Sequence, residues 1–155
     1  MASRLVGLEE IEAVARPIVE RIVWCPVATV GADGAPRTRL MHPVWWWDGE
    51  RPAALVSARP TPLKVRHQAV HPAISGFYWD PSHDTVAIDA DAEWVDPDQR
   101  AEVWDAIRAV APPVGFDPAL IWPEGPTAAD CGFLRLTATR IVATPAAQEA
   151  LRWQP

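Results

Sequence analysis

The stretch PVATVGADGAPRTRLMHPVWWWDGERPAALVS, residues 26–57, decides how this chain folds. Its apolar and β-branched residues fall into three segments, 26–30, 36–47 and 53–57, which the dipeptides Asp33-Gly34 and Asp48-Gly49 separate. Asp-Gly readily adopts the positive φ angles that a tight hairpin turn requires. The stretch therefore predicts three consecutive antiparallel strands.

The rest of the chain extends this pattern with more strands and a few helices. Residues 85–95, TVAIDADAEWV, alternate between apolar and polar side chains, as a half-buried strand does. Further strands are predicted at residues 73–79 and 131–144, and helices at residues 8–22, 62–70 and 97–110, with a short helical turn at residues 118–122. Six strands with hairpin turns and interrupting helices predict a mainly β fold, an antiparallel barrel with flanking helices.

Composition limits the kinds of protein that this chain can be. With 155 residues, 49% apolar and 22% charged, it is expected to be a single globular domain spanning residues 1–155. A net charge of −6 disfavours a nucleic-acid partner, since proteins of that class are usually basic. No apolar run approaches the roughly 20 residues that cross a bilayer, and the N-terminus lacks a signal-peptide core. We expect a cytoplasmic protein without a membrane partner.

The cysteines and histidines do not predict a metal centre. Cys25 and Cys131 lie far apart and match no metal-ligand or redox spacing, so buried free thiols are expected. His67 and His71 share one face of a predicted helix, but no acid or cysteine accompanies them at ligand spacing. We therefore predict no metal site.

An anion site is predicted where the third strand leads into the next helix. Ser57, Arg59 and Thr61 stand in the connection, and Lys64 lies in the first helical turn. Thr61 is a good N-cap, and Pro62 suits the first helical position, where its missing N–H costs nothing. Hydroxyl groups, cations and the positive end of a helix together favour binding of a phosphate or a similar anion.

Two arginines of the second predicted strand extend this site. Arg37 and Arg39 share one face because strand side chains alternate, and pairing with the third strand would bring that face near Ser57 and Arg59. With Lys64 the site would then hold up to four cations. The alternative is that both strand arginines are solvated and pair with acids.

Three consecutive tryptophans, Trp45, Trp46 and Trp47, end the second predicted strand. Their side chains alternate between faces, so we expect at least one ring inside and one outside. Such rings suit a core and a dimer interface, or one of them lines a pocket for a planar ligand.

The order of these segments resembles a known family. VATVGADGAPRTRLMHPVWW, then LVSARPTPLKVRHQAVHPAISGFYW, then DTVAIDADAEWV is similar to the pyridoxamine 5′-phosphate oxidase-like, FMN-binding split-barrel superfamily. More narrowly, it resembles the actinobacterial branch that overlaps the flavin/deazaflavin oxidoreductases. The resemblance covers residues 8–144. It implies a six-stranded antiparallel Greek-key split β-barrel with flanking helices, which forms a homodimer with two cofactor sites at the subunit interface.

The resemblance also implies which residues hold the phosphate of FMN. Arg39, with Arg37 as the alternate, matches the family's strand arginine, and Lys64 matches its lysine at the start of the helix. Ser57 and Thr61 match the hydroxyl positions. The deazaflavin branch often carries extra basic residues for a longer phosphodiester tail, and Arg59 and Arg66 leave that alternative open.

Other matched positions would lie along the flavin ring. The segment His42, Pro43, Val44 and Trp45 would run beside the isoalloxazine. Thr85, with Asp84 before it, matches the position of a polar side chain that reaches the flavin from the partner subunit. Arg152 and Trp153 echo a C-terminal arginine and tryptophan that cover the cofactor in the family's oxidase.

From this resemblance we expect an FMN-dependent oxidoreductase that transfers a hydride to or from a small substrate. The matched residues do not name a catalytic acid or base, a substrate or an electron donor. A reductase that uses the deazaflavin coenzyme on the same fold is the alternative enzyme. An alternative of another class is a non-enzymatic flavin or haem carrier or sensor, in which haem would take an axial ligand from His42, His67, His71 or His83.

Overall fold

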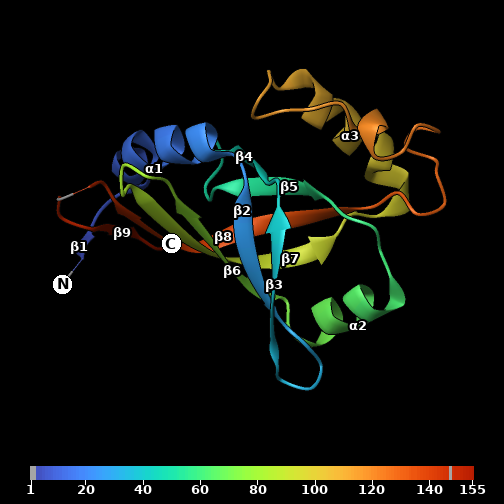
Figure 1. Cartoon of the computed structure of the whole chain (residues 1–155), viewed down its shortest axis with the longest axis horizontal. Coiled ribbons are helices and arrows are strands. Elements are labelled where there is room, and N and C mark those ends of the chain that lie inside the picture. The colour runs from blue at the N-terminus through green and yellow to red at the C-terminus, as the bar shows by residue number, and fades with distance from the viewer. Residues whose placement is uncertain (1–2, 147) are drawn as a thin grey trace.

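The computed structural model describes residues 3–146 and 148–155, which form one mixed sheet with flanking helices (Figure 1). Within these residues the strands are β1 (Arg4–Leu5), β2 (Cys25–Val30), β3 (Pro36–Met41), β4 (Val44–Trp46), β5 (Ala53–Ser57), β6 (Ala73–Trp79), β7 (Thr85–Trp94), β8 (Phe133–Thr144) and β9 (Leu151–Trp153). The helices are α1 (Leu8–Ile22), α2 (Pro62–Val70) and α3 (Arg100–Ala109), with 3₁₀ turns η1 (Pro97–Gln99) and η2 (Pro118–Leu120).

The sheet divides at its longest strand, β8. One edge of β8 pairs with β7 along almost its whole length, while the other edge is shared between two strands. Phe133–Thr137 pair with β5, and Ile141–Ala143 pair with β9. The main path runs β1-β9-β8-β7-β6-β2-β3, and β5 carries β4 away from it. The predicted mainly β fold with flanking helices is confirmed, but as a sheet of nine described strands that does not close into a barrel.

The predicted continuous strand over residues 36–47 is wrong. β3 ends at Met41 and β4 begins at Val44, so the chain breaks at His42 and Pro43. Proline has no N–H for a sheet ladder and restricts the residue before it. The break also changes partners, because β3 pairs with β2 whereas β4 pairs with β5. His42 thereby lies in the link between β3 and β4, the strands at the far ends of the two branches of the sheet.

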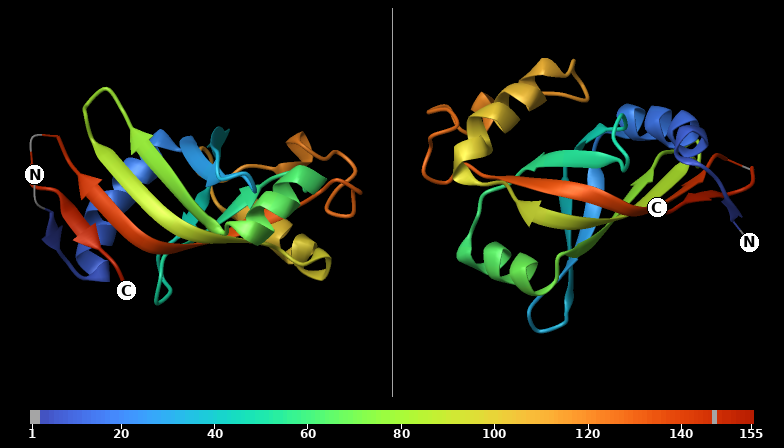
Figure 2. Two further views of the ribbon diagram at one scale, coloured as in Figure 1. Left: turned by 90° about the horizontal axis from the view of Figure 1, so that it is seen from below. Right: turned by 180° about the vertical axis from the view of Figure 1, so that it is seen from behind.

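Other differences from the predicted elements are smaller. β7 and β8 are slightly shorter than predicted, and the helix predicted over residues 97–110 consists of η1 followed by α3. The N- and C-terminal strands, β1 and β9, were not predicted, and they pair in parallel with each other. In both views of Figure 2, the two chain ends lie at the same end of the molecule, as this pairing requires.

Two apolar clusters form the core. Helix α1 buries Ile11, Ala15, Ile18 and Val19 against the sheet in the larger cluster. Helix α3 buries Val103, Trp104 and Ile107 in the second cluster, at the other end of the molecule (Figure 1). None of the three consecutive tryptophans is exposed: Trp45 and Trp47 belong to the larger cluster, and Trp46 packs against the second. The rings therefore alternate as expected, but Trp46 is only partly exposed, because it packs against the second cluster.

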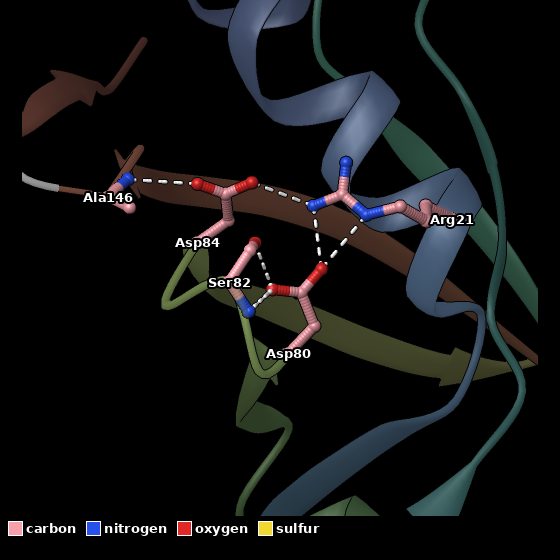
Figure 3. Close-up of polar contacts among 5 residues, drawn as sticks. All are labelled: Arg21, Asp80, Ser82, Asp84 and Ala146. Carbon is pink, nitrogen blue, oxygen red and sulfur yellow. Dashed lines mark hydrogen bonds and ion pairs between the residues drawn. The ribbon is translucent and has the colours of Figure 1, made fainter.

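An ion-pair cluster ties the end of α1 to the β6–β7 turn (Figure 3). The Arg21 guanidinium donates to Asp80 at 2.9 Å and to Asp84 at 2.8 Å. The backbone N–H of Ala146 donates to the other oxygen of Asp84 at 2.8 Å. The cluster thus joins three segments that lie far apart in sequence.

Cys25 and Cys131 are buried and free, as expected. Among the described residues, no group of three or more potential ligands could hold a metal ion. In the same part of the chain, no helix combines the length and the apolar character needed to cross a membrane.

Candidate functional site

A cleft of about 580 Å³ lies where β3, β5 and α2 meet the proline-rich segment that follows α3. This volume is within the range typical of small-molecule and cofactor sites. The strands, the loop after β5 and α2 contribute a cationic end with Arg39, Arg59 and Lys64, and the segment from 111 to 130 contributes an apolar wall. The lining residues are Trp24, Arg39, Leu40, Met41, His42, Val56, Ser57, Ala58, Arg59, Lys64, Phe116, Leu120, Ile121 and Trp122.

Three cations gather at the polar end of the cleft. Burial lowers the pKa of Lys64, and the nearby positive charges of Arg39 and Arg59 lower it further. Among the described residues, neither Arg39 nor Lys64 has a carboxylate within 4.0 Å, and no acidic residue lines the cleft. Arg39 instead donates to the hydroxyl of Thr29 at 2.8 Å. Arg39 and Lys64 therefore repel each other without a neutralising carboxylate, an arrangement that a bound anion would relieve.

Of the two predicted hydroxyl residues, Ser57 lines the cleft and Thr61 does not. The Ser57 Oγ is buried and has no hydrogen-bond partner among the described residues. A buried hydroxyl without a partner is costly, so this atom is suited to bond a ligand in the cleft. Thr61 caps α2 as predicted, accepting a hydrogen bond from the Lys64 N–H at 3.4 Å. The cap fixes the start of the helix, and with it the backbone position of Lys64.

The other two predicted arginines have different surroundings. Arg37 lies on the same face of β3 as Arg39 but does not line the cleft, and its guanidinium pairs with Asp33 at 3.3 Å in the hairpin turn. Arg59 does line the cleft, but it also pairs with Asp130 at 3.1 Å and donates to the Ile121 carbonyl at 3.4 Å. Arg59 thus attaches the proline-rich segment to the loop before α2.

His42 contacts the same segment at a second point, Val114. Its Nε2 lies 2.7 Å from the Val114 carbonyl oxygen, which can only accept, so Nε2 carries the proton in this contact. Burial lowers the pKa of His42, which keeps the imidazole neutral near pH 7 and leaves Nδ1 as an acceptor. The ring lies between Trp24, at a centroid distance of 5.1 Å, and Phe116, at 4.7 Å.

Several solved structures have this arrangement of strands and helices. A Clostridium acetobutylicum protein related to general stress protein 26 of Bacillus subtilis, of the pyridoxinephosphate oxidase family, matches with a TM-score of 0.74 and 16% identity, over 96% of each chain. A pyridoxamine 5′-phosphate oxidase-related, FMN binding protein from Nostoc punctiforme matches with a TM-score of 0.62 and 14% identity, over 94% of this chain and 86% of that one.

The chain has the pyridoxamine 5′-phosphate oxidase-like split-barrel fold. A heme binding protein from Mycobacterium smegmatis shares this fold, with a TM-score of 0.67 and 16% identity over 90% of this chain and 56% of that one. An F420 reductase is also similar. No protein-family model and no curated protein sequence matches the chain. At these identities the split-barrel likeness establishes the fold and not the ligand.

Some residues that the resemblance placed at the cofactor lie in the core of the split barrel. Val44 is fully buried in the second cluster, and Pro43 is buried beside it in the chain. Trp45 is buried in the larger cluster, where its Nε1 donates to the Tyr78 hydroxyl at 3.0 Å. None of the three lines the cleft, so any contact with a ligand there would be through the backbone.

Thr85 and Trp153 lie away from the cleft of their own chain. Thr85 begins β7 and is not among the residues that line the cleft. Trp153 lies in β9 opposite Ile141 and is buried in the larger core cluster. Within one subunit, therefore, neither side chain reaches the cationic end of the cleft.

Sequence reasoning missed the apolar wall of the cleft. Phe116, Leu120, Ile121 and Trp122 come from a proline-rich connection with no periodic pattern. Trp24 comes from the short link between α1 and β2. No local signal marks these residues, because the wall exists only once the connection folds back over β3 and β5.

Proposed function

We propose that the cleft binds FMN through its phosphate and that the protein is an FMN-dependent oxidoreductase. The observation that carries this proposal is the meeting of Arg39 and Lys64 at one end of the cleft without a carboxylate partner among the described residues. The buried Ser57 Oγ, which lacks a partner, adds a hydroxyl donor for a phosphate oxygen. These groups fit a dianionic phosphate monoester because cations and hydroxyl donors form charge-assisted hydrogen bonds to it.

Each part of the cleft has a task in this proposal. Arg39, Lys64 and Ser57 bind the phosphate, while the apolar wall with Phe116 and Trp122 accommodates the ring system and excludes water. The neutral Nδ1 of His42 accepts a hydrogen bond from a ring N–H or from the substrate. When bound, FMN supplies hydride transfer, and the chain supplies binding and orientation.

We further propose that two copies of the chain pair through an exposed apolar face of the sheet. Leu40, Phe77 and Trp79 are each about half exposed or more, at 64%, 49% and 51%. Leu40 of β3 lies opposite Pro26 of β2. The register between β2 and β6 sets the same Pro26 beside Phe77. Strands β3 and β6 therefore present Leu40, Phe77 and Trp79 on one face of the sheet. Patches of this kind mark interaction sites.

A second copy is the occupant that best accounts for this face. Leu40 also lines the cleft, so a subunit bound there would close the cleft from outside. Thr85 pairs with Trp79 and shares its face, which would bring the partner's polar strand start toward the interface. Light scattering tests this directly: the wild type is expected to be a dimer and Trp79→Glu a monomer with weaker FMN binding. A monomeric wild type would contradict the pairing.

The decisive experiment compares FMN with riboflavin, which lacks the phosphate. Titrations followed by flavin fluorescence should give tighter binding of FMN to the wild type. Arg39→Met should weaken FMN binding by tenfold or more and leave riboflavin binding unchanged, since a hydrogen bond to a charged group contributes about 1.5–3 kcal/mol. Arg37→Met is the matched control, because Arg37 pairs with Asp33 outside the cleft. Equal affinity of the wild type for FMN and riboflavin would refute the proposal.

The deazaflavin coenzyme is the second candidate. Arg59 extends the cationic end beyond Arg39 and Lys64, as a longer phosphodiester tail would require, and an F420 reductase shares the fold. Tight binding of that coenzyme together with weak binding of FMN would favour this candidate. Haem is included in the same titrations, and a Soret band lost in one histidine variant would favour a carrier or sensor.

A further inference from the structure

A second, smaller cavity opens behind the cationic end of the cleft. It has a volume of about 30 Å³ and lies between α2 and the sheet. Arg39, Met41, Ala58 and Lys64 line both the cleft and this cavity, so the two spaces adjoin at these residues. Roughly 10–15 Å³ is enough for one water molecule when several polar groups surround it.

Two residues that line the cavity carry buried nitrogen atoms without partners. Among the described residues, neither His67 Nδ1 nor Trp94 Nε1 makes a hydrogen bond, and both atoms are buried. Both side chains line the cavity. A buried donor or acceptor that remains unsatisfied costs about 1–3 kcal/mol, so each atom calls for a partner inside the cavity.

Helix α2 buries a histidine against the sheet and leaves its apolar residues exposed. His67 is 8% exposed and is the only buried residue of the helix, while Leu63 and Val70 are 50% and 53% exposed. Its ring packs closely on the β2–β3 turn, where a Cβ on Gly31 would lie 3.3 Å from His67 Cε1. A helix that only had to cover the sheet would bury its apolar residues. The buried histidine therefore points to a binding role.

We propose that His67 is a phosphate-positioning residue, acting through a water molecule held between His67 Nδ1 and Trp94 Nε1. The proposal rests on the proposed function, because the water would reach the phosphate between Arg39 and Lys64. Lys64 and His67 are three residues apart on α2 and so lie on the same side of the helix. Water-mediated bonds of this kind are nearly as favourable as direct ones.

The surroundings of His67 favour a phosphate-linked water over a metal ion. No carboxylate or thiol lines the cavity, whereas Arg39 and Lys64 bring positive charge to its mouth. Metal ions need anionic or unprotonated ligands, which this lining does not supply in number. His71 also lines the cavity, but it has no buried unpartnered nitrogen and stands one turn farther from Lys64.

The test uses the full-length protein with FMN and riboflavin as probes. His67→Phe keeps a ring of similar shape and removes both nitrogens, so FMN affinity should fall about tenfold while riboflavin affinity stays unchanged. His67→Asn replaces the polar atom near the position of Nδ1 and should restore most of the FMN affinity. Arg66→Met is the control on the same helix, because Arg66 is exposed and lines neither the cleft nor the cavity, and it should bind both flavins as the wild type does.

Each outcome decides a different point. If the wild type does not prefer FMN to riboflavin, the proposed function fails before His67 is considered. If the wild type prefers FMN and His67→Phe does so equally, the role of His67 is refuted and the phosphate site stands. An equal loss of FMN and riboflavin affinity in His67→Phe also refutes the role, since it marks general damage to the cleft.

Discussion

Replacing Lys64 by methionine should have opposite effects on the free protein and on its FMN complex. In the free protein, burial and the charges of Arg39 and Arg59 disfavour the protonated amine. Methionine keeps most of the aliphatic stem and removes the charge, so the free variant should be as stable as the wild type or more stable. If Lys64 served only to stabilise the fold, free Lys64→Met would be less stable than the wild type.

In the complex, the same substitution removes one cation from the phosphate. Hydrogen bonds between charged groups contribute about 1.5–3 kcal/mol, which corresponds to a loss of roughly tenfold to 150-fold in FMN affinity. Riboflavin affinity should be unchanged, because the lost contact is to the phosphate. Arg66→Met is the control on the same helix, since Arg66 is exposed and does not line the cleft.

Alkaline titration gives this prediction a second readout. The pKa of Lys64 is lowered in the free protein, and a bound phosphate would hold the amine protonated. FMN affinity should therefore fall as the pH rises through the pKa of the free protein. Lys64→Arg should not show this fall, because arginine stays charged over the whole range.

Two measurements together check the reasoning about Lys64. Thermal unfolding of the free proteins gives the stability, and fluorescence titrations between neutral and alkaline pH give the two flavin affinities. The reasoning is wrong if free Lys64→Met is clearly less stable than the wild type. It is equally wrong if FMN affinity is the same in both proteins.

Two further predictions concern the fold. Gly76→Ala would place a Cβ 2.8 Å from Cys25 Sγ, and overpacking of this kind should lower the free energy of unfolding by about 1–3 kcal/mol in urea denaturation. Hydrogen bonds from Ser82 and then from Arg21 hold the pKa of Asp80 in the folded protein below its usual value. As the pH falls, the unfolded chain therefore binds a proton at Asp80 before the folded protein does. Stability should thus be complete above the unfolded-state pKa of about 4 and decline as the pH falls toward the lower folded-state pKa. Arg21→Met should reduce this loss of stability in acid. If the urea midpoints of Arg21→Met and the wild type depend on pH in the same way between pH 2 and 6, the role of the cluster is contradicted.

Local patterns in the sequence predicted most elements well. The bounds of α1, α2, β5 and β6 agree with those expected, and Thr61 caps α2. These elements carry their own signals, such as helical periodicity, an N-cap followed by proline, and alternation between turn residues. Such signals act between residues a few positions apart and need no knowledge of the rest of the fold.

Elements without a local signal were missed. β1 has two residues and β9 has three, and the register that joins Arg4 to Leu151 crosses almost the whole chain. The break at Pro43 has a local signal, because proline cannot donate to a sheet ladder, yet residues 36–47 were predicted as one strand between two turns. The change of partner from β2 to β5 at this point is a property of the assembled sheet.

The sequence alone determined the chemistry that is available: a strand with two arginines, a capped helix with a lysine in its first turn, and a serine between them. Only the tertiary structure decided which of these groups meet. It sets Arg39 at the cleft while Arg37 pairs with Asp33. It also buries His67 on the inner face of α2, the helix that carries Lys64 as well. The physical reason is that residue type and spacing act locally, whereas burial, charge partners and cavity walls arise from segments that only the packed sheet brings together.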